Sequence, residues 1–152
     1  MKIFAVFLLA FACAAAALDV ADKFDATRDP AKDVAAAAEA AKAQGKRVLV
    51  DVGGEWCVWC HIMDDFIAAN PDVRSVLDAS YVVVKVNWSR ENKNEAFLSK
   101  LPAIKGYPHL FVLDASGKLV HSQDTDALEL GRSYDKAKFV AFLRKWAPPR
   151  ST

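Results

Sequence analysis

Two cysteines separated by two residues, Cys57 and Cys60, are the side chains of this sequence best suited to chemistry. A Cys-x-x-Cys pair acts as a redox disulfide, as half of a metal site or, when a histidine follows, as an attachment site for c-type haem. Zinc needs more ligands than the pair supplies, and the chain has no second such pair and only three histidines, His61, His109 and His121. The spacing therefore favours redox chemistry over zinc.

Haem attachment is an alternative that the sequence leaves open, because His61 follows Cys60 directly. His61 would then be the proximal iron ligand. The distal ligand would have to be Met63, His109 or His121, and Met63 is too close to His61 along the same predicted helix. The strand-rich pattern described below is also unlike that of a small helical cytochrome.

The local pattern places the cysteine pair where a strand ends and a helix begins. Residues 48–52 form a short β-branched run typical of a buried strand, two glycines interrupt it, and a helix is expected over residues 57–69. The N–H groups and the dipole at a helix N-terminus stabilise an anion, so the Cys57 thiol should ionise below the ordinary pKa of about 8.5. We expect Cys57 to be the approachable nucleophile and Cys60, one turn further, to be shielded.

Helices and strands alternate along the rest of the chain. Asp29 and Pro30 suit the cap and first position of a helix, and the alanine-rich run 31–44 should be helical. Further helices are expected over residues 72–79, 95–101 and 134–146, strands over 81–86, 110–113 and 119–120, and a loop over 123–133. The connections make the first two strands parallel and the last two antiparallel.

Residues 1–17 have the composition of a secretory signal peptide. A basic residue, Lys2, precedes an apolar run, and Ala15 and Ala17 form an A-x-A site with cleavage after Ala17. The run is short for a membrane span, which needs about 20 apolar residues. Retention as an uncleaved anchor and lipidation at Cys13 are the alternatives. We therefore expect a periplasmic or secreted protein with no stable membrane insertion after cleavage.

Length and charge limit what the exported chain can be. The 152 residues divide into the signal peptide (1–17), an N-terminal extension with a helix (18–45), one domain (46–147) and a tail (148–152). A formal net charge of +1 supplies no field for binding nucleic acid or an anionic membrane. After cleavage two cysteines remain, too few for a structural disulfide framework.

The segment 48–60, VLVDVGGEWCVWC, resembles the active-site region of the thioredoxin family. Asp51 stands where that family has a buried acid, and Lys85 where it has a lysine near the acid. The segment ending in Pro108 resembles the family's cis-proline loop. The resemblance covers residues 46–146 and implies an α/β thioredoxin fold, a four-stranded mixed sheet flanked by helices, here with an extra N-terminal helix.

The resemblance implies an exported thioredoxin-like thiol–disulfide oxidoreductase acting on proteins. Cys57 attacks a disulfide, Cys60 resolves the mixed disulfide by forming a Cys57–Cys60 bond, and Asp51 accepts the Cys60 proton. The backbone at Tyr107 and Pro108 pairs with an extended substrate chain. The expected partners are protein thiols or disulfides and a separate redox partner that supplies electrons. No organic cofactor and no metal is expected.

Four more side chains complete the predicted site. Trp56 and Trp59 bracket the first cysteine as an apolar docking rim, and His61 follows that cysteine by one helical turn, near enough to tune its thiolate. Lys85 is expected beside Asp51. Burial of Asp51 and the positive charge of Lys85 have opposite effects on the pKa of Asp51. The W-C-x-W-C-H string is similar to one branch of thioredoxin-like domains. A thioredoxin-like adaptor without catalysis is the other alternative left open.

Overall fold

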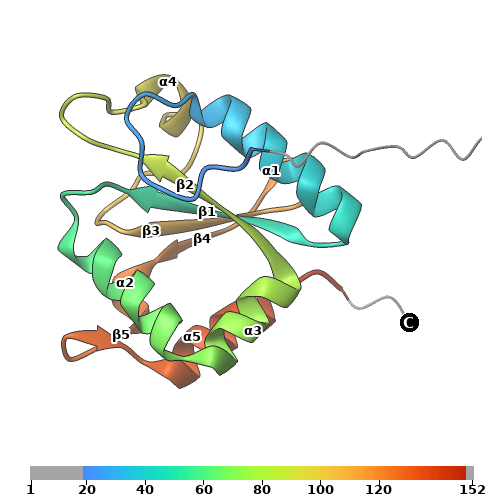
Figure 1. Ribbon diagram of the computed structural model, residues 1–152, viewed down its shortest axis with the longest axis vertical. Helices are drawn as coiled ribbons and strands as arrows, with labels where there is room; N and C mark the ends of the chain where they lie inside the picture. Colours follow the sequence, from blue (N-terminus) through green and yellow to red (C-terminus); the bar gives the residue numbers. More distant parts are fainter. Residues whose placement is uncertain (1–18, 150–152) are drawn as a thin grey trace, which may run out of the picture.

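A four-stranded mixed sheet lies between two layers of helices in the computed structural model, which describes residues 19–149 (Figure 1). The strand order is β2-β1-β3-β4. Strand β1 (Arg47–Gly53) runs parallel to β2 (Tyr81–Asn87), whereas β3 (His109–Leu113) is antiparallel to both β1 and β4 (Leu119–Asp124). The predicted strand directions are confirmed; the predicted signal peptide lies outside the described residues.

Helix α1 (Pro30–Gln44) covers one face of the sheet, where the short helix α4 (Glu95–Leu98) also lies (Figure 1). As predicted, the Asp29 side chain caps α1 by accepting hydrogen bonds from the first backbone N–H groups. Gly45 ends α1 in the left-handed conformation, with φ +64°, which glycine adopts without strain. Buried alanines of α1 pack against Val48, Val50 and Val52 of β1.

Three helices cover the opposite face: α2 (Val58–Ala69), α3 (Pro71–Ser80) and α5 (Lys136–Lys145). Successive residues of a strand point to opposite sides, so β1 and β3 contribute alternate residues to each layer. The buried residues on this side include Leu49, Met63, Leu110, Val112, Phe139 and Leu143. The start of α2, which carries the cysteine pair, therefore rests on a closely packed layer.

The segment after β3 differs from the prediction. β4 extends to Asp124 because His109 to Val112 pair with Asp124 to His121, although residues 121–124 are polar. All residues of β4 are partly exposed, as suits an edge strand. The predicted loop 123–133 also contains a 3₁₀ turn (Thr125–Leu128) and the short hairpin β5 (Glu129–Leu130) and β6 (Ser133–Tyr134). Local patterns of two residues are too short to predict such strands.

The helix predicted over residues 95–101 is also shorter than expected. α4 ends at Leu98, and after the C-cap residue Ser99 the N–H groups of Lys100 and Leu101 bond to carbonyls only three residues back. Pro102 disfavours helical geometry at the residue before it, Leu101, so the predicted helix end at residue 101 is unfavourable.

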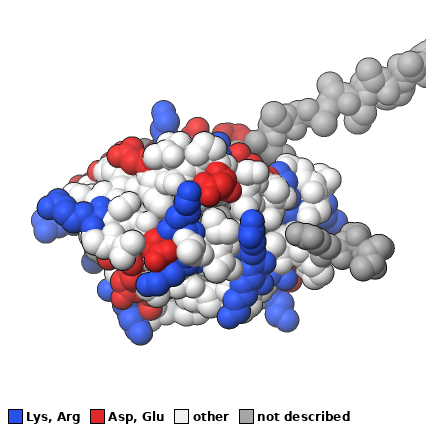
Figure 2. Space-filling model, turned by 90° about the horizontal axis from the view of Figure 1, so that it is seen from below, with Lys and Arg blue, Asp and Glu red and all other residues white. Residues whose placement is uncertain are grey.

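The molecular surface carries both signs of charge. Figure 2 shows Lys, Arg, Asp and Glu side chains on the same face. Ion pairs of this kind join Arg74 to Asp78 at 2.8 Å and Lys136 to Asp72 at 3.1 Å. Within residues 19–149, no helix has the combined length and apolar character that a bilayer crossing needs.

Candidate active site

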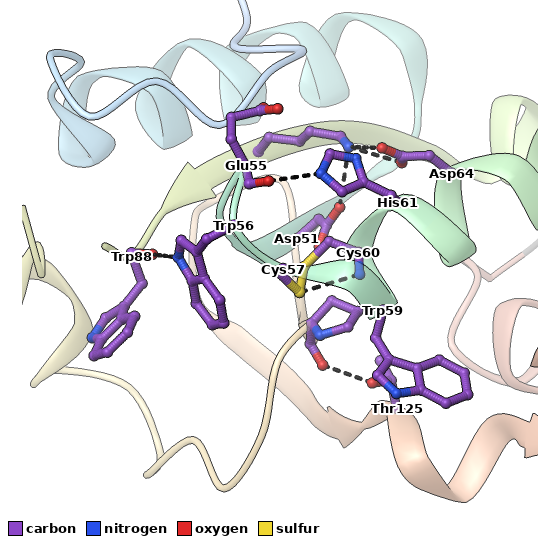
Figure 3. The surroundings of a disulfide bond; sticks show 12 residues. Asp51, Glu55, Trp56, Cys57, Trp59, Cys60, His61, Asp64, Trp88 and Thr125 are labelled. Carbon is purple, nitrogen blue, oxygen red and sulfur yellow. Dashed lines mark hydrogen bonds and ion pairs between the residues drawn. A yellow bond between two sulfur atoms is a disulfide. The ribbon is translucent and has the colours of Figure 1, made fainter. Parts of the chain in front are cut away.

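Cys57 and Cys60 form a disulfide at the N-terminus of α2 (Figure 3). Cys57 is the N-cap residue, with extended backbone angles, and its Sγ accepts a hydrogen bond from the Cys60 N–H at 3.1 Å. Its carbonyl accepts the first hydrogen bonds of the helix, from the N–H groups of Cys60 and His61. A negative charge on this sulfur would thus be stabilised by an N–H group and by the helix dipole.

Both cysteines are buried, which corrects the expectation that Cys57 is approachable. Cys57 is 2% exposed and Cys60 is 0% exposed. The two pack in one cluster with Phe24 of the N-terminal extension, and Trp59 and Tyr107 lie against it. Sequence reasoning missed Phe24 because it lies far from the motif in a polar segment.

Asp51 and Lys85 are cross-strand neighbours on β1 and β2, as the resemblance implied. Lys85 Nζ lies 3.8 Å from Asp51 Oδ2 and 2.6 Å from Asp64 Oδ2. Asp64, on the second turn of α2, is therefore the nearer partner of Lys85 (Figure 3), and sequence reasoning missed it. Asp64 follows Cys60 by four residues on the predicted helix, and this spacing places both on one helix face, which could have indicated its place near the site.

Burial raises the pKa of Asp51 to about 7. The positive charge of Lys85 opposes this shift, and the nearby Asp64 carboxylate reinforces it. Asp51 is 3% exposed, and within residues 19–149 its Oδ1 has no hydrogen-bond partner. An acid in this environment exchanges its proton near neutral pH, as a general base requires.

Gly53 relates the position of Asp51 to that of Cys60. A side chain at Gly53 would collide with Cys60 Sγ, so this sulfur lies directly against the strand. Residues two apart on a strand point to the same side, so the Asp51 side chain extends from the side of β1 on which Cys60 Sγ lies. A cavity of about 420 Å³, lined by Asp51, Lys85 and Asp64 among others, opens on this side of the sheet.

The peptide bond between Tyr107 and Pro108 is cis, as the resemblance implied. Thr125 Oγ1 donates a hydrogen bond to the Pro108 carbonyl at 2.6 Å and so ties this loop to the turn after β4. The next residue, His109, is 1% exposed, with Nε2 2.8 Å from Ser122 Oγ. Burial lowers the pKa of His109 although Asp124 lies beside it. The loop is therefore held by polar contacts beneath it.

The two tryptophans of the predicted rim lie in different surroundings. Trp56 is 52% exposed and contacts Trp88 and Tyr107 edge-on, with ring centroids 5.7 and 5.6 Å apart. Its Nε1 donates a hydrogen bond to the Trp88 carbonyl at 2.7 Å (Figure 3). Trp59 instead packs edge-on against Tyr134 of β6. Trp56, Trp88 and Tyr107 thus form an aromatic surface, and Trp88 was not predicted.

The histidines have contacts of their own. His61 is exposed, and its Nε2 lies 2.8 Å from the Glu55 carbonyl oxygen. His121 stacks on Trp146, with ring centroids 4.1 Å apart, and Met63 is in the core. With His109 engaged by Ser122, the three candidate distal haem ligands all pack in the protein interior or against other side chains. No trio of His, Cys, Asp or Glu in the described part of the chain could hold a metal ion.

A family model described as thioredoxin-like matches residues 29–115. The thiol:disulfide interchange protein DsbD of Klebsiella pneumoniae is 27% identical over 106 residues, 70% of this chain and 17% of that protein. DsbD of Pseudomonas fluorescens is 26% identical over 129 residues, 85% of this chain and 20% of that protein. The chain therefore spans about a fifth of the length of these relatives.

Two solved structures share the fold. A disulphide isomerase from Xylella fastidiosa Temecula1 has a TM-score of 0.67 and 21% identity, covering 85% of this chain and 98% of that one. The oxidised C-terminal domain of Neisseria meningitidis DsbD has a TM-score of 0.57 and 22% identity, covering 78% of this chain and 96% of that one. These likenesses confirm the α/β thioredoxin fold predicted from the sequence.

Proposed function

The chain belongs to the thioredoxin-like family, and from this premise we propose that it is a thiol–disulfide oxidoreductase acting on protein thiols or disulfides. The observation that carries the proposal is the Cys57–Cys60 disulfide at a helix N-terminus, on the side of β1 from which Asp51 extends. The DsbD relatives, which are thiol:disulfide interchange proteins by name, support the same chemistry.

Cys57 is the proposed nucleophile. In the reduced protein its thiolate attacks a substrate disulfide, a bond forms between Cys57 and one substrate sulfur, and the other substrate sulfur leaves as a thiolate. The N–H of Cys60, which bonds Cys57 Sγ at 3.1 Å, and the dipole of α2 stabilise the attacking anion. This step requires no cofactor.

Cys60 and Asp51 perform the second step. The Cys60 thiol gives its proton to the Asp51 carboxylate, and Cys60 sulfur attacks Cys57 Sγ, which releases the substrate as a thiolate and closes the disulfide. The pKa of Asp51, raised by burial to about 7, suits a base at neutral pH. The cavity lined by Asp51 and Asp64 provides a path for the proton to water. A partner protein with two thiols restores the reduced state.

The substrate binds, in this proposal, along the cis-proline loop. The backbone of Tyr107 and Pro108 pairs with an extended segment of the substrate. The exposed Trp56 ring, beside Tyr107, provides an apolar contact next to Cys57. His61 and Lys85 keep the supporting roles proposed for them from the sequence, whereas Trp59 packs against Tyr134 and supports α2 from below the rim. Residues 1–17 support export, so that the chain works in the periplasm or outside the cell.

Two matched variants test the order of events. Cys60→Ser should accumulate mixed disulfides with partner proteins, because the intermediate on Cys57 then has no resolving thiol. Cys57→Ser should accumulate far fewer, because Cys60 Sγ packs directly against β1 at Gly53, whereas Cys57 is the N-cap residue at the N-terminal end of α2. Non-reducing gels and mass spectrometry of the high-mass bands measure both, with a sample treated with reductant as the control.

The outcomes separate the alternatives. Equal trapping by both variants would contradict the assignment of Cys57 as nucleophile. If neither variant traps a partner and the wild type does not reduce a reporter protein disulfide, the chain is a thioredoxin-like adaptor. A Soret band in protein made by a haem-competent host would instead identify Cys57, Cys60 and His61 as a c-type haem site.

A further inference from the structure

Phe24 lies on the Cys57–Cys60 pair. It is 5% exposed and belongs to the same buried cluster as the two cysteines. Its ring atoms lie 3.0 and 3.2 Å from the point that a Cβ on Gly53 would occupy, and Cys60 Sγ borders the same point. The absence of a side chain at Gly53 is therefore what allows the ring to reach the strand beside the sulfur.

Phe24 is carried by residues 19–28, which we name the N-terminal cover. In Figure 1 this segment runs across β2 before α1 begins. The Ala21 carbonyl accepts a hydrogen bond from the Lys85 N–H at 2.9 Å, and the Ala26 carbonyl accepts one from Asn92 Nδ2 at 2.8 Å. Arg28 pairs with Asp33 of α1 at 2.6 Å. Besides these polar contacts, the cover is held by Ala21, which is buried in the core cluster formed by α1, β1 and β2.

Lys85 links the cover to the acids below it. Its ammonium group lies 4.5 Å from the centre of the Phe24 ring, a cation–π arrangement, while the same group contacts Asp64 and Asp51. Displacing Phe24 would remove one of the three aromatic side chains packed on the cysteine pair, the others being Trp59 and Tyr107, and would leave Lys85 with its carboxylate partners.

We infer that Phe24 is a specificity-determining residue of the disulfide exchange, which excludes small thiols from Cys57 and moves aside when a protein partner docks. The inference rests on the proposed function. In the oxidised protein a partner thiolate must reach Cys57 Sγ, form a bond to it and expel Cys60 as a thiolate. The partner's second thiolate then attacks the partner sulfur bonded to Cys57, which closes a disulfide within the partner and releases Cys57 as a thiolate. A docked protein gains contact with the exposed Trp56 and Val58, whereas a small thiol gains none.

The test measures access to the disulfide rather than catalysis. Oxidised wild type, Phe24→Ala and Phe24→Leu are mixed with dithiothreitol or with reduced glutathione, and samples are quenched with iodoacetamide. The fraction of reduced protein at each time is measured from the intact mass of the alkylated chain. Val73→Ala is the matched control, because Val73 is a buried residue of α3 in a core cluster that contains no residue of the cover. Urea unfolding of each oxidised protein accompanies the rates.

Phe24→Ala should be reduced about tenfold faster than wild type by both thiols, since the barrier includes the free energy of exposing one buried ring. Phe24→Leu and Val73→Ala should stay within about twofold of wild type, since the first keeps an apolar cover and the second leaves Phe24 in place. Equal rates for wild type and Phe24→Ala would overturn the inference. So would a Val73→Ala variant as fast as Phe24→Ala, because general loosening of the fold would then explain both.

Failure of the proposed function would be visible separately. The thiol-access rates need no enzymatic turnover, whereas the trapping of partners by Cys60→Ser does. Acceleration in Phe24→Ala together with no trapped partner would reject the oxidoreductase and leave Phe24 as the shield of a disulfide. Trapped partners together with unchanged access rates would reject the role of Phe24 alone.

Discussion

The buried acid Asp51 should make the stability of the folded protein depend on pH in a direction opposite to that of most carboxylates. Its pKa is about 7 in the folded protein, and an unfolded chain gives Asp a pKa of about 3.9. The folded state therefore holds a proton that the unfolded state releases between these values. Stability is fully present below the unfolded pKa and is lost as the pH rises through the folded pKa.

The size of this effect follows from the two pKa values. A pKa difference of about three units lowers the free energy of unfolding by about 4 kcal/mol at high pH. About 2–3 kcal/mol of this loss occurs between about pH 5 and about pH 8. Asp51→Asn removes the ionisation, so the variant should not show this loss. The free energy of unfolding of Asp51→Asn, minus that of wild type, should rise by about 2–3 kcal/mol over this range.

Urea unfolding of the oxidised proteins at a series of pH values measures this difference, and other titrations shared by both proteins cancel in it. Asp78→Asn is the matched control: Asp78 is an exposed carboxylate, paired with Arg74, and its difference from wild type should stay nearly flat. A difference for Asp51→Asn that stays constant to within about 0.5 kcal/mol would show that burial does not raise this pKa, and would remove the support for Asp51 as a base near neutral pH.

Three further outcomes are expected. Asp64→Asn should shift the pH-dependent loss of stability caused by Asp51 to lower pH, because the Asp64 charge raises the pKa of Asp51. An unshifted loss in the same urea series would contradict this. Gly53→Ala should cost about 1–3 kcal/mol of stability because its Cβ meets Cys60 Sγ, whereas Gly106→Ala, with open space around it, should change stability by less than about 1 kcal/mol. Protein recovered after export should lack residues 1–17 by N-terminal sequencing, and a retained Met1 would indicate an anchor.

Local spacing is why much of the fold and the cysteine motif could be predicted from the sequence. The buried run of β1 and the helix after it are continuous in the chain, so periodicity locates them. The pairing of Asp51 with Lys85 came from the family resemblance, and the register of β1 with β2 confirms that they are neighbours.

The rest of the site depends on tertiary packing that has no local signature. Asp64 and Asp65 are adjacent acids on α2, and only the rotation of that helix against β2 brings Asp64 to Lys85. Phe24 reaches the disulfide because the chain before α1 crosses back over β2, which no periodicity indicates. The burial of Cys57 could not be predicted for the same reason.

The backbone contact of the N-terminal cover also affects how copies of the protein meet. β2 is the outer strand of the sheet, and such strands offer main-chain groups that can recruit a strand from another molecule and start aggregation. The Lys85 N–H is already bonded to the Ala21 carbonyl, and the other outer strand, β4, carries polar, partly exposed residues. Both sheet margins are thus poor templates for intermolecular β-pairing. A chain shortened past residue 28 would present β2 to its neighbours with that protection removed.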